Sequence, residues 1–558
     1  MLGTRAIIEV LKSEGVDLAF GYPGGQVIPL FDEFHDEKEV RLILPRHEQA
    51  GAHAADGYAR VTGRPGVVIA TSGPGATNLT TGIANAHLDS IPLVAITGQV
   101  SSHLIGNDAF QEVDVVGITR SISKHNYLVK SPDELPFMLK AAFHIARSGR
   151  PGPVVVDIPS DIQRAEIRQS IPERVDIPSY QPNYEGNPRQ IERIARMINA
   201  AARPLFYVGG GVVSAGAADY LRQAAERAGI PVTCTLMALG TVRHDSPLSL
   251  GMPGMHGTLA ANRAIMDADL LIAAGARFDD RVTGKTAAFA PKARIIHIDI
   301  DPTSVSKNVR VDLPVIGGAD RILRDLAPQL EPVDRREWLA RVAAWKAETV
   351  PPPAGSPLPA ERVVAEMARL SRDRDPALVT DVGQHQMWCA LNWEHRKPRR
   401  FVSSGGLGAM GFGLPAAVGA QLGLPDSLVF CVSGDGGIQM NIQELATVAR
   451  LNLPVKIVVM NNGCLGMVRQ WQELFWKRRY SHSDLSDNPD FGRIAEAYGI
   501  RALAIRREEE ITPTLEEAIR HPGPVLVDAH IGREDNVYPM VPPGEALDWI
   551  IDGRGENS

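Results

Sequence analysis

Two polar residues at the ends of predicted strands are the first candidates for chemistry in this sequence. Asp435 follows the apolar run of "VFCVSGDGGIQMN", and Asn462 follows that of "PVKIVVMNNG", 27 residues further along. Apolar residues recur at helical spacing between them, so the predicted unit is strand, helix, strand. Loops after neighbouring parallel strands meet at the carboxyl edge of the sheet, where open α/β sheets bind ligands. We therefore expect Asp435 and Asn462 to face one another.

A metal site is the chemistry that suits these two loops. A carboxylate, an amide oxygen and a nearby backbone carbonyl are hard oxygen ligands suited to Mg²⁺, and diphosphate oxygens with a water would complete the octahedron. No "GK[ST]" follows the glycines, so the loop is not a nucleotide P-loop. The alternative is two unrelated turns at strand ends.

Two other segments carry residues that could act on a ligand. Glu48 follows the apolar run "VRLILP" and opens a helix of small residues, while "TSGPGATN" forms a glycine-rich turn with Pro74 and Asn78. Met410 lies in the glycine-rich "SSGGLGAMGFGLPAAVGA", just before a predicted helix, and its side chain is flexible enough to pack under a ligand. The alternatives are a glutamate that only complements the helix dipole and an ordinary core methionine.

These residues must be positioned by an α/β framework. Apolar β-branched runs alternate with helical segments along the chain, which is typical of parallel sheets covered by helices. The chain has 558 residues, too many for one core, and the segments "IPERVDIPSYQPNYEGNP" and "VPPPAGSPLP" divide it into three blocks. We predict three doubly wound parallel-sheet domains at residues 1–165, 188–332 and 358–535, with a C-terminal tail at 536–558. The first and third blocks are candidate structural relatives.

The composition excludes several classes of protein. Hydrophobic residues make up 44% of the chain and charged residues 22%, as in an ordinary globular protein. A net charge of −7 gives no reason to expect nucleic acid or an anionic membrane as a partner. The four cysteines form no CxxC pair, which argues against a zinc site or a disulfide framework. No signal peptide or membrane-length apolar run is visible, so we expect a cytoplasmic protein.

The motif "GDG" followed by "NN" resembles the diphosphate signature of thiamine diphosphate enzymes. Seven segments spread over all three blocks narrow the resemblance to the catalytic subunit of acetohydroxyacid synthase (acetolactate synthase): "GYPGG", "GNDAFQE", "GARFDDRVTG", "VGQHQMW", "SSGGLGAMGFGLPAA", "NNGCLGMVRQWQELF" and "VYPMVPPGEAL". The resemblance implies that the first block binds the thiamine pyrimidine, the central block FAD, and the third block the diphosphate with Mg²⁺.

The resemblance also implies a reaction between two 2-oxo acids. Pyruvate would lose CO₂ on thiamine diphosphate, and the resulting hydroxyethyl carbanion would attack pyruvate or 2-oxobutyrate. The products would be 2-acetolactate or 2-aceto-2-hydroxybutyrate, on the route to valine, leucine and isoleucine. The enzyme would be a transferase and a flavoprotein.

By resemblance, Glu48 shifts the tautomer of the pyrimidine ring, Gln111 faces the reactive carbon, and Met410 bends the two rings toward each other. The implied metal ligands are Asp435, Asn462 and the main-chain oxygen of Cys464. The implied contacts to thiamine diphosphate are Tyr22, Gly24, Gly25, Glu48, Pro74, Asn78, Gln384, His385, Gly408, Met410, Gly434, Asp435, Gly436, Gly437, Asn462, Leu465, Gly466 and Met467.

A flavin site and a substrate pocket follow from the same resemblance. FAD, structural in this family, would contact Arg150, Gly209, Gly210, Thr235, Leu236, Met255, His256, Gly275, Arg277, Arg281, Asp299, Ile300 and Asp320. The substrate pocket would include Phe110, Arg281, Met467 and Trp471. Discrimination of one extra methylene by the Trp471 wall is worth about 1–3 kcal/mol. Arg281 fits a substrate carboxylate, or alternatively a salt bridge with Asp279 or Asp280.

The expected partners also come from the family. Its sites combine the first block of one subunit with the third block of another, which implies a homodimer or homotetramer. No block remains for regulation, so a separate small regulatory subunit is expected. Ser160 stands where many family members have lysine near the substrate entrance, which puts a cation at that place in doubt.

Three alternatives stay open. A glyoxylate carboligase would be expected to lack the activating glutamate, whereas Glu48 is present. A pyruvate oxidase would use the flavin in turnover, and oxygen-dependent formation of peroxide would identify it. A non-catalytic paralogue would bind cofactors only, and the intact set of Glu48, Met410, Asp435 and Asn462 argues against it.

Overall fold

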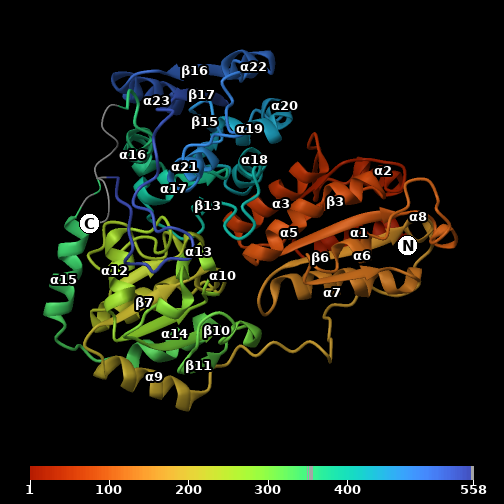
Figure 1. Cartoon of the computed structure of the whole chain (residues 1–558). Coiled ribbons are helices and arrows are strands. Elements are labelled where there is room, and N and C mark those ends of the chain that lie inside the picture. The colour runs from red at the N-terminus through yellow and green to blue at the C-terminus, as the bar shows by residue number, and fades with distance from the viewer. Residues whose placement is uncertain (349, 351–355, 554–558) are drawn as a thin grey trace.

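The computed structural model of the chain describes residues 1–348, 350 and 356–553. It contains three parallel β-sheets flanked by helices, which confirms the predicted α/β fold (Figure 1). No helix in the described part of the chain is long and apolar enough to cross a membrane.

The first sheet has the strand order β2-β1-β3-β4-β6-β5. Its strands are β1 (Leu18–Gly21), β2 (Arg41–Ile43), β3 (Gly66–Ala70), β4 (Leu93–Gln99), β5 (His125–Leu128) and β6 (Pro153–Pro159). Its helices are α1 (Gly3–Ser13), α2 (Ile28–Asp36), α3 (Glu48–Thr62), α4 (Pro74–Asn78), α5 (Thr80–Asp89), α6 (Val115–Thr119), α7 (Leu135–Arg147) and α8 (Ser160–Arg164). Strands β3, β4 and β6 are buried throughout, as their continuous apolar runs predict.

The middle sheet has the order β11-β10-β9-β7-β8. Its strands are β7 (Pro204–Val208), β8 (Val232–Cys234), β9 (Leu270–Ala274), β10 (Arg294–Asp299) and β11 (Leu313–Ile316). Its helices are α9 (Pro188–Ala200), α10 (Gly210–Ser214), α11 (Ala218–Ala228), α12 (Leu259–Asp267), α13 (Asp280–Thr283), α14 (Ala319–Leu326) and α15 (Arg336–Ala347).

The third sheet has the order β13-β12-β14-β15-β17-β16. Its strands are β12 (Ala377–Thr380), β13 (Phe401–Val402), β14 (Val429–Gly434), β15 (Lys456–Asn461), β16 (Arg501–Ile505) and β17 (Val525–His530). Its helices are α16 (Ala360–Ser371), α17 (Gln384–Asn392), α18 (Gly413–Gly423), α19 (Asp435–Met440), α20 (Leu445–Arg450), α21 (Gly466–Phe475), α22 (Phe491–Ala497) and α23 (Ile511–Arg520). Counted from the start of each domain, this order is identical to that of the first sheet, as expected of structural relatives.

Helices α3 and α18, which follow equivalent strands of the first and third sheets, pack directly on each other. A Cβ atom at Gly57 would overlap the backbone of Ala416, and one at Gly419 would overlap that of Ala54. Only glycine permits so close an approach of two helix backbones. Side chains of both domains therefore join one hydrophobic core cluster across this contact.

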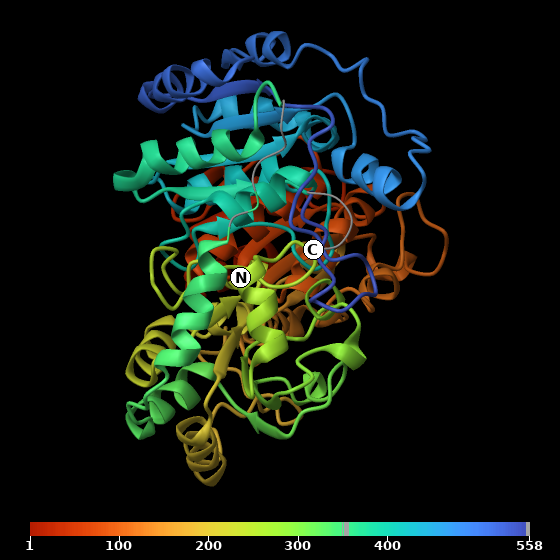
Figure 2. The same ribbon diagram turned by 60° about the vertical axis from the view of Figure 1, so that its left-hand side comes forward.

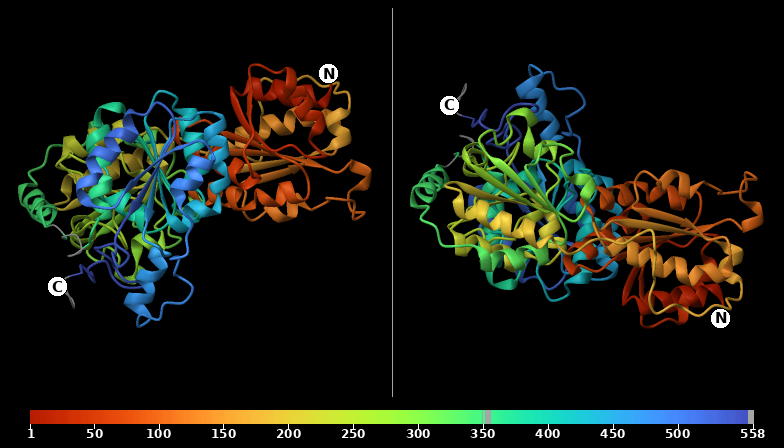
Figure 3. Two further views of the ribbon diagram at one scale, coloured as in Figure 1. Left: turned by 90° about the horizontal axis from the view of Figure 1, so that it is seen from above. Right: turned by 90° about the horizontal axis from the view of Figure 1, so that it is seen from below.

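The first domain forms a lobe beside the other two domains, which lie one above the other (Figures 1 and 3). The segment after β17 leaves the third domain and runs back to the middle one (Figure 2). There the N–H of Val541 donates to the carbonyl oxygen of Met255 at 2.7 Å, and the N–H of Lys285 donates to that of Glu545 at 2.9 Å. The C-terminal segment thus joins the third domain to the middle domain, while α3 and α18 join the first domain to the third.

Candidate active site

The loops after β12, β14 and β15 enclose a small cavity of about 60 Å³ at the carboxyl edge of the third sheet. Asp435 is the first residue of α19, and Asn462 follows β15 directly. Strands β14 and β15 are parallel neighbours, with Gly434 opposite Met460. Both predicted side chains line this cavity, so the two loops meet where the sequence placed them.

Burial makes Asp435 a carboxyl that is costly to ionise. It raises the pKa of Asp435 to about 6, although hydrogen bonds from the Asn488 side chain and the Asn462 backbone favour the charged form. The Asn488 amide donates to Oδ2 of Asp435 at 2.7 Å. A bound cation would compensate the desolvation and lower this pKa, so metal binding is coupled to loss of the proton.

The donor set of this cavity fits Mg²⁺ together with a diphosphate. Oδ1 of Asn462 already accepts the N–H of Cys464 at 3.2 Å, and its second lone pair is left for a cation. Among the described residues no group of three or more His, Cys, Asp or Glu side chains could hold a metal by itself. One carboxylate and one amide leave most of an octahedron to be filled, which diphosphate oxygens can do.

The walls of the cavity also suit a polyanion. Nε2 of the buried His385 has no hydrogen-bond partner, and burial lowers the pKa of His385 to about 4. A Cβ atom at Gly436 would lie 2.6 Å from the Leu465 side chain, so a larger residue there would require Leu465 to move. Bare backbone at a strand end, opening a helix, is a favourable place for phosphate oxygens. Predicted thiamine diphosphate contacts that line this cavity are Gln384, His385, Met410, Gly434, Asp435, Gly436, Gly437, Asn462, Leu465, Gly466 and Met467, with Cys464 beside them.

A second cavity of about 880 Å³ lies where the middle domain meets the other two. All thirteen residues of the predicted flavin set line it: Arg150, Gly209, Gly210, Thr235, Leu236, Met255, His256, Gly275, Arg277, Arg281, Asp299, Ile300 and Asp320. Gly408, Met410, Met467 and Trp471 line it as well. Because Met410 and Met467 belong to both cavities, the two spaces adjoin at these methionines.

The large cavity has the size and polar groups of a dinucleotide site. Nδ1 of the buried His256 has no hydrogen-bond partner, and burial lowers the pKa of His256 to about 4. Arg150 donates to Ser90 at 2.8 Å and pairs with Asp301 at 3.2 Å. A glycine turn at the end of β7 and acidic residues at the ends of later strands suit a diphosphate and ribose hydroxyls. These residues fit FAD.

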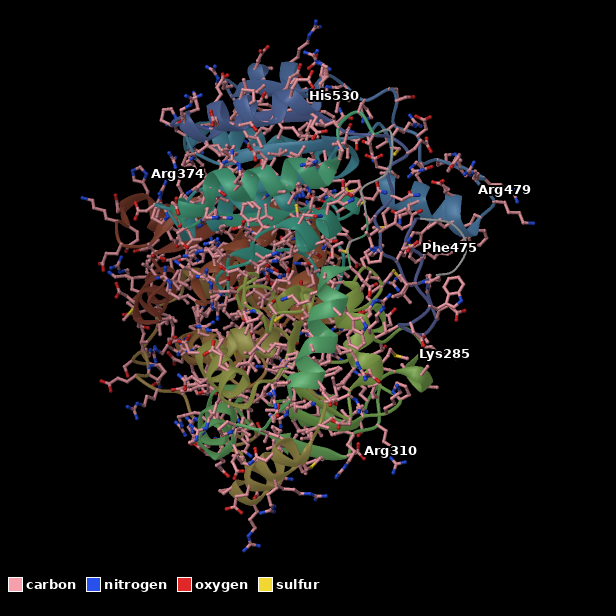
Figure 4. All side chains as sticks on the ribbon, turned by 90° about the vertical axis from the view of Figure 1, so that its left-hand side faces the viewer. Lys285, Arg310, Arg374, Phe475, Arg479 and His530 are labelled. Carbon is pink, nitrogen blue, oxygen red and sulfur yellow. The ribbon has the colours of Figure 1, made fainter. Side chains whose placement is uncertain are left out.

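Arg281 lies between the flavin residues and the third domain. Its Nη1 pairs with Asp280 at 2.9 Å, and its guanidinium lies 5.9 Å from the ring centroid of Trp471. The salt bridge considered from the sequence is therefore present, while the same guanidinium reaches the predicted specificity residue. Trp471 also packs edge-to-face on Phe475, and the segment after α21 carries Arg479 outward into solvent (Figure 4).

The residues predicted for the pyrimidine half gather at the carboxyl edge of the first sheet. Glu48 opens α3, and its Oε2 accepts a hydrogen bond from the Asn78 amide at 2.9 Å. Gln111, with a positive φ of 60°, lies over Gly73, where a Cβ atom would come within 2.8 Å of its carbonyl oxygen. Phe110 beside it is 86% exposed. The same edge carries the turn with Pro74 and the loop after β1 with Tyr22, Gly24 and Gly25.

Within the described residues, the side chains predicted to bind the pyrimidine lie away from both cavities. None of Tyr22, Gly24, Gly25, Glu48, Pro74, Asn78, Phe110 and Gln111 lines either of them. The first domain reaches the large cavity through residues at the C-terminal ends of α5 and α7, which lie at the amino edge of its sheet: Leu88, Asp89, Ser90, Arg147, Gly149, Arg150 and Pro151. Helix α3 alone has 15 residues, about 22 Å at 1.5 Å per residue. The two edges are thus separated by the depth of the domain.

Several lining residues were not predicted from the sequence. Tyr184 comes from the linker before the middle domain, and Asp89 from the end of α5. Gln386 lies on α17 beside the predicted Gln384 and His385. No local motif marks Tyr184 or Asp89, because only the packing of domains brings them to the cavity. Ser160, the departure from the family, is buried with its hydroxyl 3.1 Å from that of Ser101.

Three family models match the chain in the order of its three sheets. They describe the thiamine pyrophosphate enzyme N-terminal TPP binding domain at residues 1–118, the central domain at 191–326 and the C-terminal TPP binding domain at 381–529. The class defined by fold and site is therefore that of the thiamine pyrophosphate enzymes.

Similar proteins narrow this class. A probable acetolactate synthase large subunit from Methanocaldococcus jannaschii is 48% identical over 99% of this chain and 95% of its own length. The acetolactate synthase large subunit of Mycobacterium tuberculosis is 47% identical over 100% of this chain and 92% of its own length. The acetolactate synthase isozyme 2 large subunit of Escherichia coli K12 is 47% identical over 99% of this chain and 100% of its own length. The chain belongs to the acetolactate synthase large-subunit family, which confirms the resemblance found in the sequence.

Proposed function

We propose that the protein joins two molecules of pyruvate with loss of CO₂ to give 2-acetolactate, and pyruvate with 2-oxobutyrate to give 2-aceto-2-hydroxybutyrate. These are steps in the synthesis of branched-chain amino acids. The observation that carries the proposal is the junction of the two cavities at Met410 and Met467. A substrate in the large cavity is thereby next to the site that suits thiamine diphosphate.

Asp435, Asn462 and the main-chain oxygen of Cys464 would hold Mg²⁺, and the glycine turn before α19 would receive the diphosphate. When bound, thiamine diphosphate supplies a carbon nucleophile that stabilises charge after decarboxylation. Met410, on the shared wall, would fix the angle between its rings. These assignments draw on the family and on the cavity in which the side chains lie.

Substrate binding would fall to residues of the large cavity. Arg281 offers a guanidinium for a carboxylate, and the indole of Trp471 offers an apolar wall for the methyl group of 2-oxobutyrate. Met467 lies between this wall and the thiamine cavity. FAD would occupy the remainder of the large cavity as a structural group.

The pyrimidine half would come from a second copy of the chain. Glu48, Asn78 and Gln111 lie together at an open edge, away from the cavities of their own chain, so another copy can present them to the cofactor. Residues 1–165 would then serve the pyrimidine, 188–332 the flavin and 358–535 the diphosphate. We propose a homodimer or homotetramer. Relatives are named large subunits, which supports a small regulatory partner for this chain too.

The test is to incubate the purified protein with pyruvate, thiamine diphosphate, Mg²⁺ and FAD while measuring acetolactate and oxygen. Acetolactate should form without oxygen uptake. Oxygen-dependent peroxide would instead indicate a pyruvate oxidase, and activity with glyoxylate alone would indicate a glyoxylate carboligase. No turnover of any 2-oxo acid by cofactor-loaded protein would favour the non-catalytic paralogue.

A further inference from the structure

The loop of residues 403–411 carries Met410, which lines both cavities. Ser404, Gly405, Gly406, Leu407, Gly408 and Met410 all line the large cavity. Between β13 and α18 the loop has no regular secondary structure, so its backbone groups need partners from elsewhere. How the loop is held thus decides where Met410 lies.

Asp89, at the end of α5 in the first domain, supplies two of these partners. Its Oδ2 accepts the N–H of Gly405 at 3.0 Å, and its Oδ1 accepts the N–H of Gly406 at 2.7 Å. A Cβ atom at Gly406 would lie 2.9 Å from Oδ1 of Asp89 and 3.1 Å from Nη2 of Arg277. The glycine therefore lets the carboxylate reach the backbone next to the flavin-facing Arg277.

A buried cation keeps this carboxylate paired. Arg60, on α3, donates from Nη2 to Oδ2 of Asp89 at 2.7 Å, and the two side chains are 5% and 2% exposed. The same guanidinium donates to the carbonyl oxygen of Ser403 at 2.7 Å, and it also pairs with the buried Asp56. Asp56 and Asp89 together raise the pKa of Arg60, which stays charged. Removal of one member of a buried ion pair is costly, because it leaves a buried charge without its partner.

Hydrogen bonds between uncharged groups also connect the loop to the first domain, beside the ion pair of Asp89 and Arg60. The hydroxyl of Ser404 donates to Oδ1 of Asn85 at 2.5 Å and accepts the N–H of Ala409 at 2.9 Å. The Asn85 amide in turn donates to Asp56 at 3.0 Å. Helices α3 and α5 of the first domain thereby hold the 403–406 end of the loop, and Ser404 links that end to Ala409, the residue before Met410.

The other side of Met410 is fixed from within the third domain. The buried carboxylate of Asp381 accepts the N–H of Gly411 at 3.0 Å and that of Gly413 at 2.8 Å. Two buried aspartates from different domains thus bracket Met410. Of the two, only Asp89 depends on how the first domain packs against the third.

We propose that Asp89, paired with Arg60, is a positioning residue for the reaction: it fixes the 403–411 loop and so sets Met410 and the wall toward the substrate. Asp89 need not touch substrate or cofactor for this role. The inference rests on the proposed function for its kinetic consequence, but the ordering of the loop is independent of any cofactor.

Asp89→Asn tests the proposal, because it removes the charge while keeping the size. Hydrogen–deuterium exchange of the cofactor-free full chain should show the amides of residues 403–411 exchanging about tenfold faster or more, with the rest of the third domain unchanged. In the loaded protein, kcat should fall about tenfold or more while KM for pyruvate changes little, since a small displacement at the reacting centre is costly.

Lys140→Met is the matched control. Lys140 pairs at 2.5 Å with Glu14 in the same domain, and the two side chains are 8% and 3% exposed, while Glu14 keeps its pair with Arg147. This variant should lower the melting temperature without affecting exchange in the 403–411 loop or kcat. If Asp89→Asn does not fold, Ser404→Ala loosens the same loop and leaves the ion pairs intact, and it should raise exchange at Ala409.

Unchanged exchange and kcat in Asp89→Asn would overturn the proposal. So would a rise in exchange across the whole first domain with kcat following only the folded fraction. Failure of the wild-type protein to form acetolactate would count against the proposed function instead. The exchange measurement would still decide the role of Asp89 in the loop.

Discussion

The first and third domains share one strand order but place different residues on their equivalent loops. The loop after the third strand of each sheet is glycine-rich: it carries Pro74 and Asn78 in one domain and Asp435 in the other. The loop after the second strand in sequence carries Glu48 in one and Met410 in the other. Topology therefore fixes where functional loops emerge, while residue type decides which group each loop offers.

The two edges also differ in their surroundings. Asp435 lies buried in a cavity that its own domain completes, whereas Glu48 and Asn78 form a pair that lines neither of the two cavities found among the described residues. Two half-sites of opposite character in one chain complement each other when a second copy adds the missing half. The difference between the domains thus supports a site shared between chains.

The largest loss of turnover is expected when Asp435, in the buried cavity of the third domain, is replaced. Asp435→Ala removes the only carboxylate among the predicted metal ligands. Turnover should fall about a thousandfold or more, a barrier increase of about 4 kcal/mol. Calorimetric titration with thiamine diphosphate and Mg²⁺ should show no binding. The control is Asp426→Ala, an exposed residue of the same domain that should bind normally. Normal binding by Asp435→Ala would contradict the metal assignment.

Replacement of Glu48, at the carboxyl edge of the first sheet, should reduce turnover and preserve the binding of thiamine diphosphate. Glu48→Gln keeps an acceptor for the Asn78 amide but cannot exchange a proton with the pyrimidine ring. Turnover should fall about a hundredfold, within the range for a lost acid–base group. The affinity for thiamine diphosphate, measured by the same titration, should change little. Full turnover by Glu48→Gln would rule out its role in activation.

Mixing the two inactive variants sharpens the comparison between the halves. If each site combines Glu48 of one chain with Asp435 of another, a mixed dimer of Glu48→Gln and Asp435→Ala chains has one intact site. After unfolding and refolding together, random pairing should restore about a quarter of wild-type activity. Each variant refolded alone is the control. No recovery, with mixed dimers present by native mass spectrometry, would place the site within one chain.

A smaller effect is expected at the wall between the domains. Trp471→Leu should lower the preference for 2-oxobutyrate over pyruvate about tenfold, because the contact discriminates one methylene. The ratio of the two products in a competition assay measures it. Trp476→Leu is the matched control, since Trp476 is 65% exposed and lies just beyond α21. An unaltered ratio in Trp471→Leu would remove this residue from the substrate pocket.

The last prediction concerns the stability of the first sheet and no change in turnover. Asp157, on β6, accepts hydrogen bonds from Thr97 at 2.6 Å and Gln99 at 2.9 Å, and burial raises its pKa from 3.8 to about 7. The folded state therefore binds this proton more tightly than the unfolded chain. The resulting stabilisation is complete below pH 4 and is lost as the pH rises toward 7.

Thermal unfolding of wild type and Asp157→Asn between pH 5 and 7.5 checks this prediction. The free energy of unfolding of wild type relative to the variant should decrease by about 1–3 kcal/mol across that range, because the amide does not titrate. Parallel pH profiles for the two proteins would show that Asp157 is ionised in the fold throughout.

The sequence predicted the central strands better than the edge strands. Strands β4, β9 and β15 each contain a run of four or five consecutive apolar residues, because both faces of a parallel sheet are covered. Strands β5, β11, β13 and β16 were not predicted, and each lies at the edge of its sheet. They are shorter or only partly buried, as in β16, so no continuous apolar run marks them.

The residues of the candidate site, like the strands, divide into those that the sequence predicted and those that it did not. Loops at strand ends are local features, and they indicated Asp435, Asn462 and Glu48 as candidates, whereas the flavin set came from the resemblance to the family. The residues that order these loops from another domain have no local signature. Asp89 is an ordinary helix-terminal aspartate in the sequence and becomes a ligand of the 403–411 backbone only when α5 packs against the third domain.

The sequence by itself determined the three α/β sheets with their helices, the loops that carry the candidate residues, and the family. These depend on hydrophobic periodicity and on short motifs, which act over one strand–loop–helix unit. The tertiary structure decided that the two cavities meet at Met410 and Met467, and that Glu48 lies at the far edge of its own domain. Such relations depend on how helices such as α3 and α18 pack. Packing of that kind is a property of surfaces assembled from distant segments, which no single segment encodes.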